Sequence, residues 1–284
     1  MSETNALRVT GASQIMFILC DPVHHVRGTD ILNQRMLGDG IDGVVVPVNV
    51  GAEDLGATVT TLRRMKNLSG FGVTIPHKIA VLAHLDGLTP EAERVGSVNF
   101  VRREPDGSLI GTNVDGSGFV RGALDSGITL AGRRVLQLGA GGAGRAVAFS
   151  IAAAEPAELV IWNRTPERAE ALVADVSAAV PGCVVRTGDN NPVGFDVLVN
   201  TTSAGMRGEP ATAVHLGQIR AGLAVAEIVI SPAETPLLAA ARAQGAVTST
   251  GAGMLDAQYE LMRDFLQLRR ATVRPEPRPH TTPV

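Results

Sequence analysis

Residues 135–154 read VLQLGAGGAGRAVAFSIAAA, and this stretch decides the fold of the second half of the chain. A buried strand (135–138) leads directly into the glycine-rich turn 139–144, and an alanine-rich helix follows from 145 to 154. G-x-G-x-x-G alone is a weak motif, but a strand before it and a helix after it make it specific for dinucleotide binding. The first glycine permits a tight turn, the second lets the backbone approach a pyrophosphate, and the third lets the helix pack on the strand. The free N–H groups at the start of the helix then face the phosphates.

The end of the next strand indicates which dinucleotide the turn takes. NAD-binding domains usually have an acidic residue there, which bonds the ribose 2′-hydroxyl. Here the strand 159–162 ends in Trp162-Asn163-Arg164-Thr165, and Arg168 follows one helical turn later. A carboxylate would repel a 2′-phosphate, whereas two arginines can clamp one through charge-assisted hydrogen bonds. The sequence therefore predicts NADP as the cofactor. The alternative is that Arg164 and Arg168 are solvated surface residues.

Strands alternate with helices along the whole chain, which predicts the α/β class and a parallel, doubly wound sheet in the second half. A length of 284 residues suits two domains. Aromatic residues make up only 3%, so aliphatic side chains must fill both cores. The predicted strands are 14–20, 44–50, 72–75, 98–102, 109–113, 135–138, 159–162, 197–200 and 223–230. The predicted helices before residue 250 are 29–37, 53–65, 76–86, 115–124, 145–154, 167–180 and 236–244.

Composition excludes several classes of partner. A net charge of −3 argues against nucleic acid, because binding to a phosphate backbone needs a basic surface. No apolar run approaches the roughly 20 residues of a membrane span. No secretion signal is expected, because residues 1–12 lack a basic region followed by an apolar core. Cys20 and Cys183 lack a CxxC spacing, so reduced thiols in a cytoplasmic protein are expected. No metal is predicted, because His24 and His25 have no cysteine or acidic cluster beside them.

Seven motifs occur in the order and spacing of one known family. They are VTIPHK (73–78), GSVN (96–99), GTNVDG (111–116), GAGGAGRA (139–146), NRT (163–165), TPLL (235–238) and GAGMLDAQ (251–258). Together they resemble the shikimate/quinate dehydrogenase family over about residues 21–265. This resemblance is specific, because it spans nearly the whole chain.

The resemblance implies a two-domain α/β protein with its active site in the cleft between the domains. An N-terminal substrate-binding domain would span 1–115, and a Rossmann-type NADP-binding domain 116–250. A C-terminal helix, 251–272, would return to the first domain, ahead of a disordered tail, 273–284. The implied activity is that of an NADP-dependent alcohol dehydrogenase that interconverts 3-dehydroshikimate and shikimate. That reaction belongs to the shikimate pathway, which leads to chorismate and the aromatic amino acids.

Residue by residue, the resemblance matches Lys78 and Asp115 to the catalytic pair, and Thr74, Asn99 and Gln258 to substrate-contacting positions. Hydride arrival at a carbonyl carbon builds negative charge on oxygen, which an ammonium stabilises while a proton is delivered. Which member of the pair is the formal acid stays open. The structural alternative for Lys78 is an exposed lysine early in a helix. Asp115 is also expected to N-cap its helix, which does not exclude a catalytic role. The expected cofactor-binding residues are Gly139, Ala140, Gly141, Gly142, Ala143, Gly144, Asn163, Arg164, Thr165, Arg168, Thr201 and Gly251.

The chain departs from the family in the expected substrate pocket. The family has His-Ser-x-Ser-Pro, whose hydroxyls bind the substrate carboxylate, where this chain reads His-Val-Arg-Gly-Thr (25–29). Gly72 and Ile230 likewise replace an asparagine and a tyrosine. Losing the hydroxyls should weaken a carboxylate contact by about 0.5–1.5 kcal/mol per neutral hydrogen bond. We hypothesise that Arg27 or Thr29 replaces them; Arg27 pointing to solvent is an equal alternative.

The substrate therefore stays open between shikimate, quinate, aminoshikimate and another alcohol. A non-catalytic NADP-binding regulatory protein is a further alternative, although keeping Lys78, Asp115 and Asn99 counts against it. The expected partner is a small hydroxy acid, and the protein is expected to be a monomer or a homodimer.

Overall fold

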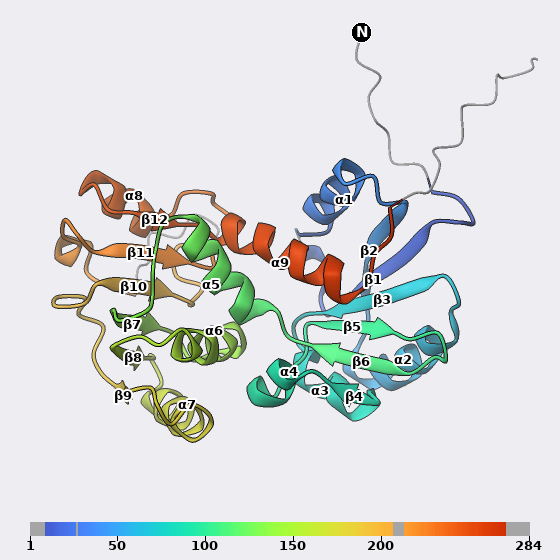
Figure 1. Cartoon of the computed structure of the whole chain (residues 1–284), viewed down its shortest axis with the longest axis horizontal. Helices are drawn as coiled ribbons and strands as arrows, with labels where there is room; N and C mark the ends of the chain where they lie inside the picture. The colour runs from blue at the N-terminus through green and yellow to red at the C-terminus, as the bar shows by residue number, and fades with distance from the viewer. Residues whose placement is uncertain (1–8, 27, 207–212, 271–284) are drawn as a thin grey trace, which may run out of the picture.

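The computed structural model of the chain describes residues 9–26, 28–206 and 213–270, which form two lobes (Figure 1). Each lobe is built around its own six-stranded sheet covered by helices, so the α/β class predicted from the sequence is confirmed. The expected tail (273–284) lies outside the described residues.

The sheet of the first lobe is mixed. Across the sheet the strands are β2 (Gly43–Asn49), β1 (Gln14–Cys20), β3 (Leu68–Val73), β5 (Phe100–Arg103), β6 (Leu109–Thr112) and β4 (Gly87–Leu88). Strands β2 and β3 run parallel to β1, whereas β5 runs antiparallel to both β3 and β6.

The sheet of the second lobe is parallel throughout, as predicted. Across the sheet the strands are β9 (Val185–Thr187), β8 (Glu158–Trp162), β7 (Arg134–Leu138), β10 (Val197–Asn200), β11 (Ala224–Glu227) and β12 (Thr248–Ser249). Numbered within the lobe, this is the order 3-2-1-4-5-6 of the doubly wound dinucleotide-binding fold. The order reverses beside β7, and the glycine-rich turn follows directly from that strand.

The helices of each lobe cover the faces of its sheet. In the second lobe, Val147 and Ile151 of α6 pack in one core with Val135, and Leu238 of α8 packs in another with Leu136. The α-helices are α1 (Gly28–Gly38), α2 (Leu55–Arg64), α3 (His77–Ala80), α4 (Pro90–Val95), α5 (Asp115–Asp125), α6 (Gly142–Ala153), α7 (Pro166–Ala179), α8 (Pro236–Ala243) and α9 (Gly251–Phe265). Short 3-10 turns are η1 (Val23–His25), η2 (Ala52–Asp54), η3 (Val81–His84) and η5 (Leu216–Gln218).

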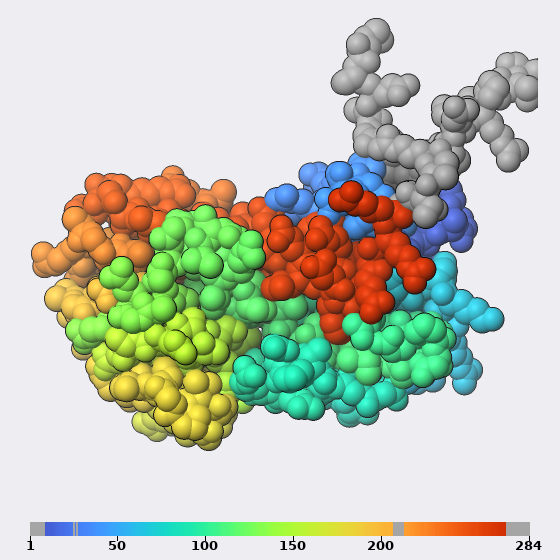
Figure 2. Space-filling model, in the orientation of Figure 1, coloured from blue at the N-terminus to red at the C-terminus, as the bar shows by residue number. Residues whose placement is uncertain are grey.

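Helix α9 joins the two lobes, and in Figure 2 it covers their junction. Met254, near its start, belongs to a core of the second lobe, whereas Tyr259 and Met262 pack with Met16 in the first lobe. The helix ends at Phe265 instead of reaching residue 272 as predicted. It stops there because Gln267 has a left-handed φ of 53°.

Three further predictions needed correction. The helix predicted over 76–86 is two short pieces, α3 and η3, because the carbonyl of Lys78 accepts a bond from the Val98 N–H instead of continuing a helical ladder. The strand predicted at 72–75 is β3, which starts at Leu68 and ends at Val73, since Thr74 turns the chain towards His77. The strand predicted at 223–230 ends at Glu227. The sequence interpretation missed β4, α4, β9 and β12, all of six residues or fewer.

Candidate active site

The carboxylate of Asp115 is the centre of a cluster in which three predicted site residues meet. Lys78 Nζ donates to Asp115 Oδ2 over 2.5 Å. Asn99 Nδ2 donates to Oδ1 over 2.9 Å, and Gln258 Nε2 donates to the same oxygen over 3.1 Å. The Asp115 side chain is 9% exposed and that of Lys78 is 22% exposed. The Lys78 side chain is therefore partly open to solvent beside a carboxylate that is almost buried.

Four separate segments bring these side chains together. Lys78 lies in α3, Asn99 precedes β5, Asp115 begins α5, and Gln258 extends from α9. Val114, and not Asp115, takes the N-cap position of α5, so the capping role considered for this aspartate is wrong. Its carboxylate is free of the helix end and is used by the cluster.

A second layer of buried amides holds Asp115 and Asn99 in place. The Asn99 Oδ1 atom accepts from the Val114 N–H over 3.0 Å, and Asn113 Oδ1 accepts from the Asp115 N–H over 3.0 Å. Asn113 in turn donates to Ser97 Oγ over 3.0 Å. The sequence analysis did not assign roles to Asn113 or Ser97. An asparagine two residues before an aspartate is a recognisable turn-forming signal that could have identified the first of them.

Lys78 is fixed through its neighbours. His77 is 1% exposed, and its Nε2 atom lies 2.7 Å from the carbonyl oxygen of Val50. The His77 N–H donates to the carbonyl of Thr74, which places Thr74 in the turn that leads into α3, with its side chain partly exposed. Thr74 therefore lies beside the lysine segment, and its contact with substrate stays a prediction.

The loop expected to bind a carboxylate is described only in part. Arg27 lies outside the described residues. Thr29 is 9% exposed in the first turn of α1, and the described side chains that donate to Asp115 do not include it. A Cβ atom on Gly28 would lie 3.9 Å from Leu255 Cδ1, so this end of α1 faces α9 one turn before Gln258.

The glycine-rich turn has the features that a pyrophosphate requires. Added Cβ atoms at Gly139 and Gly144 would each come within 2.6 Å of Thr201 Oγ1, so both positions exclude any side chain. At Gly141 and Gly142 an added Cβ would meet nothing within 4 Å, which leaves open space in front of α6. No side chain caps this helix, so its first N–H groups are available to a ligand. These residues fit a dinucleotide.

The strand that follows α6 places two arginines beside this turn. Asn163 connects them to it, because Asn163 Oδ1 accepts from the Ala140 N–H over 3.1 Å. Arg164, Thr165 and Arg168 are exposed, and neither arginine forms an ion pair within the part of the chain that the structure describes. Two unpaired guanidinium groups at this position can bind a phosphate.

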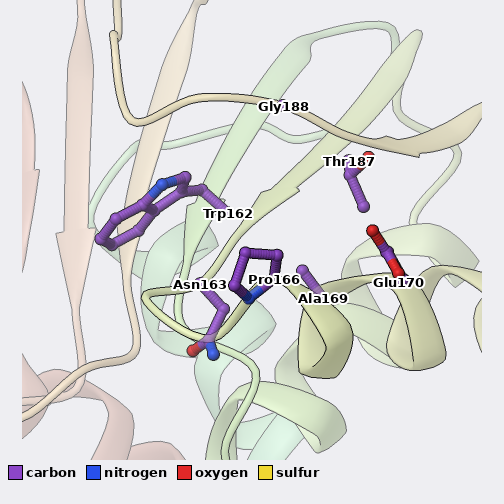
Figure 3. A pocket seen from close by; sticks show the side chains of 7 residues that line it. All are labelled: Trp162, Asn163, Pro166, Ala169, Glu170, Thr187 and Gly188. Atoms are coloured by element: carbon purple, nitrogen blue, oxygen red, sulfur yellow. The ribbon is translucent and has the colours of Figure 1, made fainter.

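A cavity of about 310 Å³ opens at the same end of the second sheet (Figure 3). Trp162 and Asn163 lie on one side of it, and Thr187 and Glu170 on the other. Arg164 and Arg168 lie outside its lining, which consists of Trp162, Asn163, Pro166, Ala169, Glu170, Thr187 and Gly188. The cavity is joined to the glycine-rich turn through Asn163, which lines it and accepts from the Ala140 N–H.

The last two predicted cofactor residues are packed against backbone. Thr201 Oγ1 lies 2.8 Å from the carbonyl oxygen of Leu138 and 3.1 Å from that of Gly139. Gly251 begins α9, where an added Cβ would lie 2.4 Å from the carbonyl oxygen of Val229. Both residues therefore shape the loops at the edge of the sheet.

Among the described residues, no helix is long and apolar enough to cross a membrane, and no group of three metal-binding side chains occurs.

Two family descriptions match the chain. Residues 18–101 match "Shikimate dehydrogenase substrate binding domain", and residues 123–207 match "Shikimate / quinate 5-dehydrogenase". Shikimate dehydrogenase (NADP(+)) of Geobacter metallireducens is 40% identical over 263 residues, which cover 89% of this chain and 90% of the relative.

Solved structures give the same picture. Shikimate 5-dehydrogenase of Thermus thermophilus, in complex with NADP(H) and shikimate, has a TM-score of 0.80 and 33% identity, covering 89% of this chain and 93% of the other. A ligand-free 5-ketofructose reductase of Gluconobacter sp. has a TM-score of 0.83 and 32% identity, covering 89% and 92%.

Proposed function

Because this chain belongs to the shikimate/quinate dehydrogenase family, we propose that it is an NADP-dependent oxidoreductase that interconverts 3-dehydroshikimate and shikimate. The observation that carries this proposal is the cluster in which Lys78, Asn99 and Gln258 all donate to the carboxylate of Asp115. A protein that only binds NADP has no need of a buried carboxylate paired with a lysine that reaches solvent.

The bound cofactor supplies a hydride to the ring carbonyl in one direction and accepts one in the other. The Lys78 ammonium stabilises the negative charge that develops on the substrate oxygen, and the Lys78–Asp115 pair delivers the proton that completes the alcohol. Asn99 and Gln258 orient Asp115 and thereby keep the lysine directed at the reacting oxygen. In the oxidative direction the same pair removes the hydroxyl proton.

Cofactor binding follows from the second lobe. The turn 139–144 and the open start of α6 receive the pyrophosphate, and Asn163 couples this turn to the NRT segment. Arg164 and Arg168 bind the 2′-phosphate, which gives NADP its advantage over NAD. Thr165, Thr201 and Gly251 shape the surrounding loops.

We propose the domain boundaries as 1–115 for substrate binding and 116–250 for the cofactor, with α9 returning to the first domain. The shared packing of α9 with both cores supports this division. A cytoplasmic location and a monomeric or homodimeric state complete the proposal, and two cysteines without a disulfide fit a reducing compartment.

A second candidate substrate is a neutral polyhydroxylated ketone. Val26 and Gly28 carry no hydroxyl at the positions where the family resemblance expects two serines, so the pocket lacks two donors for a carboxylate. The similarity to a 5-ketofructose reductase favours the same reading, since its name implies a substrate without a carboxylate.

The two candidates are separated by following reduced-nicotinamide absorbance with the purified full chain. Shikimate and quinate are tested with NADP and with NAD, and 5-ketofructose is tested with NADPH. We expect NADP-dependent oxidation of shikimate. NADPH consumption with 5-ketofructose and none with shikimate would replace the acid by the neutral ketone. Tight NADPH binding without turnover of any of them would support the regulatory alternative instead.

A further inference from the structure

Gln137 is a buried polar residue in β7, where the other buried residues are apolar. It lies in β7 between Leu136 and Leu138, and it is 0% exposed. Its side chain shares the face of the sheet that carries Val135 and packs against α6, directly below the glycine-rich turn. The polar residue is visible in the sequence VLQL (135–138), but no role was predicted for it.

The amide of Gln137 contacts both ends of the turn. Its Nε2 atom donates to the carbonyl oxygen of Gly139 over 2.9 Å and to that of Gly144 over 2.8 Å. These are the first and the last glycine of G-x-G-x-x-G. One side chain therefore bonds to both ends of the phosphate-binding loop.

Each of these bonds also sets the direction of a peptide plane. In a trans peptide the N–H points opposite to the carbonyl, so holding the Gly139 oxygen aims the Ala140 N–H away from the strand. That N–H donates to Asn163 Oδ1 over 3.1 Å. In the same way the Arg145 N–H, opposite the Gly144 carbonyl, donates to the Gly141 oxygen over 2.7 Å. Gln137 thus sets the directions of the peptide planes at both ends of the glycine-rich turn.

Burying the Gln137 amide has a cost in stability, and this cost indicates that the residue is kept for a function. The Gln137 Oε1 atom is buried and has no hydrogen-bond partner among the described residues. A buried polar atom without a partner destabilises a fold, and an apolar residue of similar shape avoids the penalty. Stability alone therefore does not explain a glutamine at this position.

We propose that Gln137 is a positioning residue for pyrophosphate binding, whose amide holds the two ends of the glycine-rich turn in their ligand-binding geometry. This inference rests on the proposed NADP-dependent function. It predicts that removing the two N–H donors weakens contacts to the pyrophosphate while leaving contacts to the 2′-phosphate unchanged.

The test is Gln137→Met, which keeps the length of the side chain but donates nothing. We expect the Kd for NADPH, measured by fluorescence in the absence of substrate, to rise about tenfold, equivalent to about 1.4 kcal/mol. The KM for NADP should rise similarly, with kcat and the KM of the other substrate little changed. The inhibition constant of adenosine 2′-phosphate, which has no pyrophosphate, should stay the same.

Val135→Ala is the matched control, because Val135 lies on the same strand and face and is equally buried. It should lower the free energy of unfolding and leave the Kd for NADPH unchanged. If Gln137→Met folds poorly, Gln137→Leu removes the same donors and should show the same rise in Kd.

Wild-type affinity for NADPH in either Gln137 variant would overturn the inference. Equal losses of affinity for NADPH and for adenosine 2′-phosphate would also overturn it, because they would indicate a general disturbance of the lobe. Failure of the wild-type protein itself to bind NADPH would instead contradict the proposed function.

Discussion

The two halves of the candidate site differ in how far their charges are already paired. In the first lobe, the carboxylate of Asp115 accepts from three side chains and is almost buried. In the second lobe, Arg164 and Arg168 are exposed, and no ion pair within the described ranges uses them. A site that performs chemistry needs groups held in place before the substrate arrives, because reorganising them during the reaction raises the barrier. A binding clamp can take its counter-charge from the ligand. The difference predicts that changes in the first half reduce kcat, whereas changes in the second half reduce affinity.

The largest effect is expected from removing the ion pair between Lys78 and Asp115. Lys78→Met removes the only cation bonded to Asp115 among the described side chains, and it should lower kcat by roughly 10²- to 10⁴-fold, the usual contribution of general acid–base groups. The Kd for NADPH should stay within about twofold of wild type, because Lys78 lies in the other lobe. Steady-state kinetics together with fluorescence titration measure both quantities. A variant with near-normal kcat would remove Lys78 from the reaction.

The second-largest effect is expected from removing the two unpaired arginines of the second lobe. Arg164→Ala combined with Arg168→Ala should raise the KM for NADP by about tenfold or more, since hydrogen bonds to charged groups contribute about 1.5–3 kcal/mol. The KM for NAD should change little, because NAD has no 2′-phosphate. Arg186→Ala is the control, as this exposed arginine of the same lobe pairs with Glu158 instead. Equal losses for both cofactors would show that the arginines do not read the 2′-phosphate.

A third change tests how the cluster around Asp115 is assembled. An added Cβ at Gly122 of α5 would lie 2.9 Å from the backbone of Gly253 in α9, so Gly122→Ala should force the two helices apart. Overpacking of this kind costs typically about 1–3 kcal/mol. Because α9 carries Gln258 to Asp115, kcat should fall as well. Urea unfolding and kinetics measure the two effects. Unchanged kcat in a destabilised variant would show that the Gln258 contact is dispensable.

The smallest effect concerns a buried carboxyl group at the end of β11 in the second lobe. Glu227 is 1% exposed, and burial raises its pKa, although bonds from Thr235 and Asn200 lower it in part. A raised pKa means that the folded state favours the protonated form. The stabilisation is therefore complete below the ordinary glutamate pKa of 4.5 and is lost as the pH rises through the folded value.

Glu227→Gln should make the free energy of unfolding less dependent on pH between 4.5 and the raised pKa of the folded state, as measured by urea titrations at several pH values. Glu170→Gln is the control, since Glu170 is exposed and water solvates its charge. An identical pH profile for wild type and Glu227→Gln would exclude this role for the buried carboxyl.

Much of the second lobe could be predicted from local pattern, because parallel strands buried on both faces appear as apolar runs between helices. The strand before the glycine-rich turn and the helix after it lie within three residues of their predicted limits. The short elements escaped prediction for physical reasons. Strand β9 has three residues, two of them exposed, so no apolar run marks it. Helix α4 has only six residues, although Thr89 caps it and Gly96 ends it in a left-handed conformation.

The sequence by itself determined the α/β class, the family, the dinucleotide turn and the identities of Lys78, Asp115, Asn99 and Gln258, because these depend on local order and on motifs. Only the tertiary structure decided that these side chains converge on one carboxylate, that Asp115 does not cap its helix, and that Gln137 supports the glycine-rich turn from below. Gln258 is 143 residues from Asp115 along the chain, and their contact requires α9 to cross α5 at glycines that allow close approach. Local propensity carries no information about such a crossing, which is fixed only when the two lobes pack around α9.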